Sequence, residues 1–254
     1  MRVRIRAIVT IGLLTIATAG QVSAQTPAQR PRGRFRIGLN AGAQPSTISF
    51  AASATRPVYL ENSVVDTAYR AGKGPLFDGN AGVRILGGFG VGIAVSWFSK
   101  KDDAAIHAAI PHPFFFNAAR SIDGMAGGLR RDELVTHLQA VYSIRPTPRI
   151  DVALTAGPSF FRVTQAFVYD VSYGETYPYD TATLTSAVSK RVSGHKTGFN
   201  AGADVGLRFS RNIGVGGLVR FSKAEMQFVL PNGVTSAKSD AGGIHAAGGL
   251  RLYF

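Results

Sequence analysis

The residue types that hydrolytic chemistry requires are present in this chain, but no spacing links them. The candidate nucleophiles are Ser96 and Ser121. The candidate bases are His107 and His112, and Glu133 is the candidate orienting carboxylate. A catalytic triad needs these groups within hydrogen-bonding reach of one another, near one rim of the fold. The two histidines also lack a third metal ligand at a matched spacing. The sequence therefore predicts no catalytic residue, no metal site and no cofactor.

A second set of charged residues recurs among small ones. These arginines and carboxylates alternate with apolar residues and stand beside Gly, Ala, Ser and Asn. If they share a narrow interior, each carboxylate must be paired, because a buried unpaired charge is strongly unfavourable. The predicted lumenal ion-pair network consists of Arg36, Arg84, Glu133, Asp151, Asp204, Arg208, Arg220 and Arg251. His137 and His245 are expected beside it as members of a hydrogen-bond network.

The elements that must position these residues are strands. Period-two alternation, with an apolar face opposite a small or polar face, marks a strand between two different environments. In "RFRIGLNAGAQ", for example, Phe35, Ile37 and Leu39 oppose Arg36, Gly38 and Asn40. The pattern predicts eight strands, at residues 34–44, 80–86, 89–99, 133–144, 150–161, 198–210, 213–222 and 244–254.

The predicted connections alternate between short and long. Hairpin turns are expected at Gly87–Gly88, at 145–149 and at 211–212. Long loops are expected at about 45–75, 100–130, 163–195 and 227–239. An even strand number with this alternation is typical of an outer-membrane barrel. We predict an all-β fold, an eight-stranded antiparallel up-and-down transmembrane β-barrel over residues 34–254, in the cell outer membrane.

The N-terminus has the organisation of a secretory signal peptide. Three arginines precede an apolar run from Ala7 to Gly20, which is too short to span a bilayer as a helix, and "VSA" follows. We predict a signal peptide at 1–24 and a linker at 25–33. The chain contains no Cys and carries a net charge of +13. Because an exported protein does not meet cytoplasmic nucleic acid, this basicity predicts contact with anionic lipid and no nucleic-acid partner.

The C-terminus carries a recognisable ending. In "GLRLYF", Leu250, Leu252 and Phe254 alternate with Arg251 and Tyr253. This ending resembles the C-terminal signal of bacterial outer-membrane proteins. The chain is similar to the small eight-stranded barrels, the outer membrane protein β-barrel domain family that includes the OmpA transmembrane domain, OmpX and OmpW types. The resemblance implies that Leu250, Leu252 and Phe254 form an assembly signal read by the barrel-assembly machinery.

The long loops are expected to carry surface contacts. Phe114, Phe115 and Phe116 are predicted to form a rim or lid, similar to interfacial aromatic anchors. A tyrosine-rich stretch at 169–179, which itself alternates, predicts a protruding hairpin suited to an extracellular protein or glycan. The basic loop positions have two equally supported interpretations: they contact lipopolysaccharide phosphates, or they are simply solvated. These positions are Arg120, Arg130, Arg131, Lys190, Arg191 and Lys196.

Three function classes follow. The favoured one is a structural or surface-interaction barrel without turnover, because an eight-stranded barrel is just wide enough for its lumen to be filled by side chains. The alternative is a narrow channel for small solutes. The second alternative is an outer-membrane lipid-modifying enzyme, a hydrolase or acyltransferase.

Overall fold

The computed structural model describes residues 34–230 and 236–254, and most of these lie in strands. The predicted signal peptide (1–24) and linker (25–33) lie outside the described residues. In the part of the chain that is described, no helix is long and apolar enough to cross a membrane. The strands are β1 (Phe35–Gln44), β2 (Ile48–Val58), β3 (Glu61–Ala71), β4 (Gly74–Leu86), β5 (Phe89–Ile110), β6 (Arg120–Ile144), β7 (Ile150–Glu175), β8 (Ala182–Arg208), β9 (Ile213–Val229) and β10 (Ser236–Tyr253).

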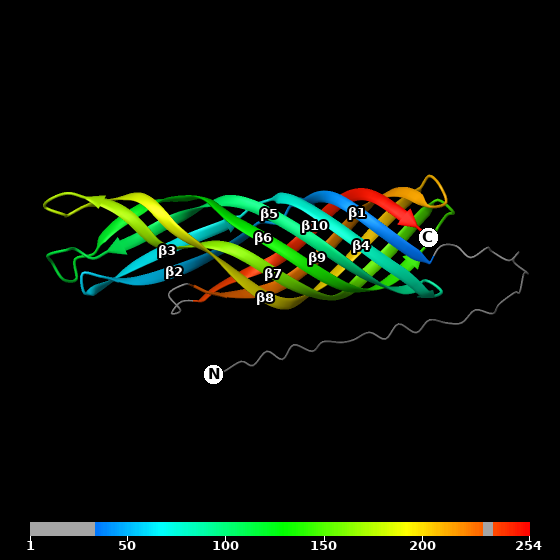
Figure 1. Ribbon diagram of the computed structural model, residues 1–254, viewed down its shortest axis with the longest axis horizontal. Helices are drawn as coiled ribbons and strands as arrows, with labels where there is room; N and C mark the ends of the chain where they lie inside the picture. The colour runs from blue at the N-terminus through cyan, green and yellow to red at the C-terminus, as the bar shows by residue number, and fades with distance from the viewer. Residues whose placement is uncertain (1–33, 231–235) are drawn as a thin grey trace, which may run out of the picture. The chain divides into compact units, whose positions relative to one another are not determined.

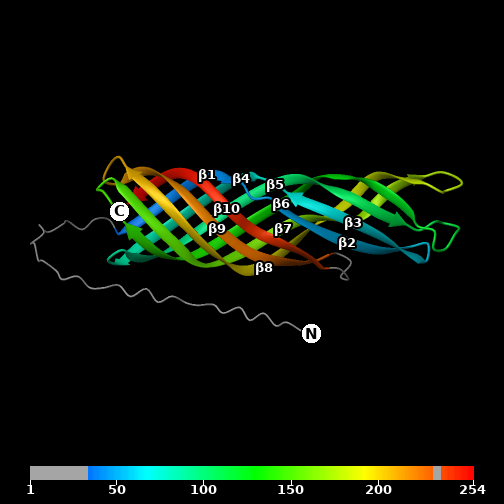
Figure 2. The same ribbon diagram turned by 180° about the vertical axis from the view of Figure 1, so that it is seen from behind.

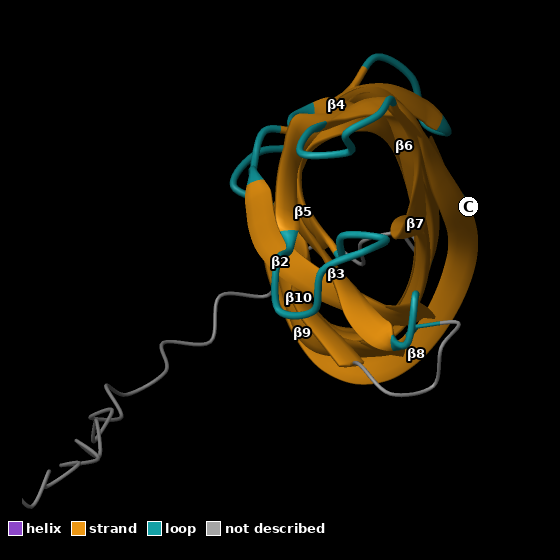
Figure 3. Ribbon diagram, turned by 90° about the vertical axis from the view of Figure 1, so that its left-hand side faces the viewer, coloured by secondary structure: helices purple, strands orange, loops and turns teal. Residues whose placement is uncertain are grey.

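Eight of these strands form a closed antiparallel ring. Its order is β1, β4, β5, β6, β7, β8, β9, β10 and back to β1, with every neighbouring pair joined by a hydrogen-bonded ladder. The strands run obliquely around the ring, which Figure 1 and Figure 2 show from opposite sides and Figure 3 shows end-on. The eight-stranded antiparallel architecture predicted from the alternation is confirmed.

The four expected long loops are largely strand, which corrects the prediction. The segment 45–75 contains the hairpin β2–β3, whose second strand pairs with the far half of β5 through Val64–Tyr69 and Ala104–Ala109. The segments 100–130 and 163–195 are continuations of β5 and β6 and of β7 and β8, so the protruding hairpin expected at 169–179 is present. Much of 227–239 likewise extends β9 and β10.

These segments were not predicted as strands because the polarity of each long strand inverts along its length. In the first half of β5 the outward residues are apolar, as at Val95 and Trp97, and the inward ones are small or polar. Beyond Phe98 the outward residues become Lys101, Asp103 and His107, while Ala104, Ile106, Ala108 and Ile110 turn inward and are buried. The strand therefore changes from a membrane pattern to that of a water-soluble sandwich.

Strands β7 and β9 invert in the same way. On β7, Phe160 faces outward and Phe161 faces inward, and on β9 the outward Phe221 is followed by Lys223 on the same face. A bilayer takes about 9–11 residues of a tilted strand, whereas β5 to β8 have 22 to 27 residues each. Each therefore projects well past the apolar band. We call the projecting part the extension; its described residues are 48–71, 99–130, 162–196, 223–230 and 236–243. The opposite end, with the short turns and Phe254, is the turn end.

The wall of the extension has a seam between β2 and β10. In the described sheet order β2 is an end strand, and its second edge has no ladder partner. Ser46 Oγ accepts a hydrogen bond from Ile244 N at 2.9 Å where the seam begins. Farther from the turn end, a cleft of about 580 Å³ lies between the edges of β2 and β10, with Ile48, Phe50 and Met226 in its lining.

The chain terminus closes the ring at the turn end. Phe254 and Phe35 exchange two backbone hydrogen bonds of 3.0 Å each. Leu250 and Phe254 are exposed on the apolar outer face, whereas Arg251 and Tyr253 are buried inside. The last strand therefore has the two faces that the alternation in "GLRLYF" predicts.

Candidate functional site

The lumen at the level of the apolar band is filled by polar side chains that fit against glycines. A Cβ placed on Gly216 would lie 3.0 Å from Arg251 Nε, and one placed on Gly38 would lie 2.6 Å from Asn80 Oδ1. Small residues on the inner face thus leave space for long guanidinium groups and amides. Three layers of polar contacts follow one another from the turn end toward the extension.

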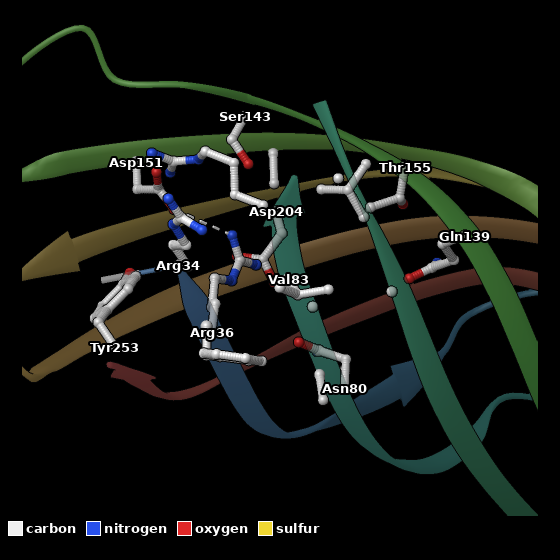
Figure 4. A pocket seen from close by; sticks show the side chains of 18 of the residues that line it. Arg34, Arg36, Asn80, Val83, Gln139, Ser143, Asp151, Thr155, Asp204 and Tyr253 are labelled. Carbon is white, nitrogen blue, oxygen red and sulfur yellow. Dashed lines mark hydrogen bonds and ion pairs between the residues drawn. The ribbon is translucent and has the colours of Figure 1, made fainter. Parts of the chain in front are cut away.

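The first layer surrounds two aspartates near the turn end. Arg251 donates from Nε and Nη2 to Asp204 at 3.0 and 2.8 Å, and Arg36 Nη2 lies 2.6 Å from the same carboxylate. Asp151 accepts from Arg36 at 3.3 Å and from Arg145 at 3.2 Å. Figure 4 shows Arg36, Asp151 and Asp204 at one pocket. Because both carboxylates are buried, this pairing offsets the loss of their hydration.

The second layer crosses the middle of the lumen. Arg220 pairs with Asp78 and also donates to Ser96 Oγ at 3.0 Å, and Ser96 donates to Asp78 at 2.9 Å. His137 Nε2 lies 3.1 Å from Ser96 Oγ, and its Nδ1 lies 2.7 Å from Ser159 Oγ. Since the one hydroxyl proton of Ser96 goes to Asp78, Ser96 accepts from His137 Nε2, and Nδ1 accepts from Ser159. The layer is a buried and connected hydrogen-bond network.

The third layer lies where the extension begins. Arg131 Nε donates to Glu133 Oε1 at 2.6 Å, and its Nη2 donates to the carbonyl of Asp240 at 2.7 Å. Glu133 also accepts from the backbone N–H of Gly242 at 2.9 Å. Arg131 and Glu133 are both buried, so this pair ties β6 to β10 across the interior.

The structure places the predicted network residues in the lumen but pairs some of them differently. Arg36, Asp151, Asp204 and Arg251 meet in the first layer, Arg220 is in the second and Glu133 in the third. Arg84 lines the pocket of the first layer, and Arg208 stacks over the ring of Tyr253 at 3.7 Å from its centroid. His137 and His245 are buried in the lumen, with ring centroids 6.5 Å apart.

The alternation does not indicate three charged members of the lumen, Asp78, Arg145 and Arg131. Asp78 stands two residues before Asn80 on the same face, so a strand extended through Pro75 would have included it. Arg145 was assigned to a turn, although its side chain reaches Asp151. Arg131 and Arg120 were considered as contacts for lipopolysaccharide, but both are buried and cannot meet lipid phosphates. Lys190 and Lys196 are exposed, and Arg130 and Arg191 pair with Asp132.

The candidate catalytic residues do not converge. Ser96 is enclosed in the second layer, where it donates to a carboxylate and not to a histidine. His107 Nδ1 lies 2.7 Å from Asp123 Oδ1 on the outer face of the extension, and this hydrogen bond raises the pKa of His107. His112 Nδ1 accepts from the backbone N–H groups of Phe114 and Phe115. Ser121 is exposed beyond the membrane band and Glu133 is paired in the third layer.

The interior of the extension is a packed apolar core. Four aromatic rings from β2, β3, β7 and β9 meet at its centre, with centroid separations of 4.8 Å for Phe50 and Tyr69, 5.5 Å for Tyr69 and Phe167, and 5.1 Å for Phe167 and Phe228. Burial raises the pKa of Tyr69 to about 12, while its Oη accepts from Val168 N at 2.8 Å. The lumen is thus followed by a dry, aromatic interior.

The distal ends of the extension form a surface that we call the tip, residues 59–60, 111–119 and 176–181. Arg120 holds its segments together, because it pairs with Glu175 and donates to the carbonyls of Tyr179 at 3.0 Å and Pro111 at 2.9 Å. The exposed apolar side chains of the tip include Tyr59 (47%), Leu60 (93%), Phe114 (66%), Phe115 (63%), Phe116 (70%) and Tyr177 (82%). The phenylalanines therefore do not act as anchors at the membrane surface, since all of β5 beyond Phe98 separates them from the apolar band.

A closed ring with an apolar belt, a polar lumen and a terminal aromatic defines an integral outer-membrane barrel protein. Residues 14–232 match the outer membrane protein beta-barrel domain, and the chain belongs to this family. Its short turns therefore lie on the periplasmic side and its extension on the outside. The protein is located in the outer membrane.

Solved structures are similar to the chain at low sequence identity. The outer membrane protein OprG of Pseudomonas aeruginosa is 11% identical and has a TM-score of 0.51, covering 87% of this chain and 96% of that one. The outer membrane protease OmpT of Escherichia coli is 8% identical, with a TM-score of 0.48 and coverage of 88% and 97%. Neisserial surface protein A is 13% identical, with a TM-score of 0.38 and coverage of 87% and 97%. No curated protein matches the chain significantly in sequence.

Proposed function

We propose that this protein is a closed barrel whose role is structural or surface-interacting, without turnover and without a conducting path. The observation that carries the proposal is the inversion of polarity along the long strands. On the turn-end side of the inversion, arginine and carboxylate side chains cross the lumen. On the extension side, an apolar core fills the interior of the ring. An ion that passes the third layer would meet Phe50, Tyr69 and Phe167, and burying an unpaired charge there is strongly unfavourable.

The tip supports a role in surface contacts. Exposed aromatic side chains give a large contact area at a low cost in conformational entropy. Their supporting loops are ordered by the buried Arg120. Among the described residues near the tip, Glu61 and Asp180 form no salt bridge with Arg or Lys. Both are acidic, whereas the chain as a whole is basic. We infer that the tip contacts an extracellular protein or glycan and not the anionic lipid of its own membrane.

Two measurements test the proposed function. The folded protein in planar bilayers is expected to show no stepwise conductance, and a regular conductance would favour the narrow-channel alternative. Turnover of labelled outer-membrane lipid by the same preparation would favour the enzyme alternative.

The surface role is tested on cells that display the protein. Replacing Phe114, Phe115 and Phe116 together by Ser is expected to abolish binding to immobilised host proteins or glycans, without changing the amount of folded barrel. Lys190→Ser, on the side of the extension, is the matched control and should bind like the unaltered protein. Equal binding by the triple variant would contradict a role for the tip.

A further inference from the structure

Arginines outnumber carboxylates at the periplasmic mouth of the lumen, among the residues that the structure describes. Among the described residues that face the lumen between the mouth and the second layer, the arginines are Arg36, Arg84, Arg145, Arg208, Arg220 and Arg251, and the carboxylates are Asp78, Asp151 and Asp204. Arg34 adds a further guanidinium at the rim of the pocket. The terminal residue Phe254 lies at the same rim, with its main chain paired to Phe35 and its side chain facing lipid.

The three carboxylates are already engaged, so they do not compensate this excess. Asp78 is paired with Arg220, Asp204 with Arg36 and Arg251, and Asp151 with Arg36 and Arg145. Arg145 Nη1 is buried and has no hydrogen-bond partner within residues 34–230 and 236–254. A buried N–H donor on a cation without an acceptor is costly, which favours an acceptor that carries negative charge.

A cavity lies among these donors. It has a volume of about 50 Å³, and Arg34, Arg36, Arg84, Arg145, Asp151 and Asp204 are in its lining. Figure 4 shows Arg34 and Arg36 around it together with the two aspartates. At about 10–15 Å³ per water-sized position, the space accommodates roughly three to five such positions. This suits a small oxyanion such as a single phosphate group.

We propose that the periplasmic mouth is a binding site for a phosphate-type oxyanion. Arg145 binds it through its free Nη1, and Arg34 binds it from the rim. Arginine is well suited to this because its fork of donors matches the oxygens of a phosphate group. The site is a dead end, since the second layer and the apolar core lie behind it. The oxyanion comes either from the periplasm as free phosphate or from the headgroup of a phospholipid at the mouth.

The test uses the full mature barrel, folded in maltoside micelles that contain no phosphate. Inorganic phosphate is titrated at constant ionic strength, with sodium chloride as the balancing salt, and binding is followed by calorimetry and by phosphorus NMR. Saturable binding of one phosphate per barrel is expected. Arg145→Gln should weaken it roughly 10- to 100-fold, the usual effect of losing a hydrogen bond to a charged group. The matched control is Arg211→Gln, in an exposed turn at the same end.

Arg34→Gln is the second variant, because Arg34 is exposed and its loss does not threaten folding. Heat-modifiable gel mobility verifies that each variant is folded. The proposal is overturned if phosphate shows no saturable binding, if both Arg145→Gln and Arg34→Gln bind normally, or if Arg211→Gln weakens binding as much as they do. Conductance and cell-binding assays do not report on this site, so their outcome is independent of it.

Nanodiscs distinguish the two sources of the oxyanion. If a phospholipid headgroup occupies the site, discs that contain phosphatidylglycerol should suppress binding of added phosphate, relative to discs of an uncharged glycolipid. Equal binding in both discs assigns the site to free periplasmic phosphate. Either result supports an oxyanion site, provided that Arg145→Gln weakens phosphate binding in the same discs.

Discussion

Removing Asp204 should destabilise the barrel strongly, because it leaves a buried arginine without its counter-charge. Asp204 is 3% exposed and Arg251 is fully buried, and the two are joined by two hydrogen bonds. Breaking a buried ion pair by deleting one member costs about 3–5 kcal/mol. We expect Asp204→Ala to fall near the lower limit, since Arg251 keeps Asn40 Oδ1 at 2.6 Å and the Leu250 carbonyl at 2.9 Å, and Arg36 keeps Asp151.

The assay is reversible urea unfolding in micelles or thin bilayers. With a denaturant slope of about 2 kcal/mol per molar urea, a loss of about 3 kcal/mol lowers the midpoint by roughly 1.5 M. The matched control is Asp240→Ala, which removes an exposed ion pair with Lys223 at 3.3 Å. Such pairs contribute only about 0–1 kcal/mol, so this midpoint should move by less than about 0.5 M.

A double-mutant cycle separates the pair from general damage. In the double variant Asp204→Ala with Arg251→Met, the buried guanidinium that Asp204 compensated is removed as well, and much of the stability lost in Asp204→Ala should return. If Asp204→Ala leaves the midpoint where Asp240→Ala leaves it, or if the double variant is no more stable than Asp204→Ala, the ion-paired lumen is refuted. An open, hydrated lumen would then explain the tolerance.

Three further predictions concern the ends and walls of the barrel. Deleting Phe254 should slow or abolish insertion in cells, seen as loss of the heat-modifiable folded band, because the last strand loses its lipid-facing anchor; an unchanged band would contradict this. The pKa of His107, followed by NMR, should fall in Asp123→Asn, since the hydrogen bond to Asp123 favours the protonated ring; the small stabilisation from this pair is present at low pH and is lost as pH rises through the raised pKa. Gly216→Leu should lower the urea midpoint, because its Cβ would lie 2.4 Å from the Val205 carbonyl oxygen and 3.0 Å from Arg251 Nε. Gly217→Leu, whose Cβ has its nearest neighbour at 3.9 Å, should not; equal midpoints would refute the close packing.

The part of the fold that contacts lipid was predictable because one physical contrast dominates it. Hydrocarbon outside and a narrow polar lumen inside impose strict alternation, as at Val91, Ile93 and Val95 between small residues. The turns followed from the same pattern, and Gly87, with a φ of 56°, lies in one of them. Charged positions such as Asp204 and Arg251 were identifiable as inward from phase alone.

The extension was not predicted, because its alternation has the opposite phase. If apolar residues are expected to face lipid, the stretches "DDAAIHAAI" and "RVTQAFVYD" have no regular pattern. In the first of them, however, Ile106 and Ile110 follow a regular alternation on the inner face. The sequence also could not predict which arginine pairs with which carboxylate within the lumen. Which aspartate Arg220 meets depends on the stagger between strands far apart in sequence, and Asp78 is 142 residues away from it.

The inversion of polarity explains why barrel and extension form one continuous wall. Cross-strand partners link Phe98 on β5 to Glu133 on β6, and Glu133 to Val163 on β7, so the change occurs at nearly one level around that side of the ring. If the strands slipped by one residue, inward charges such as Glu133 would face lipid, which costs several kcal/mol each. The same slip would place the apolar residues of the extension in water. Membrane and water therefore favour the same register from opposite ends of each strand, and this agreement lets strands of more than 20 residues pair without an intervening loop.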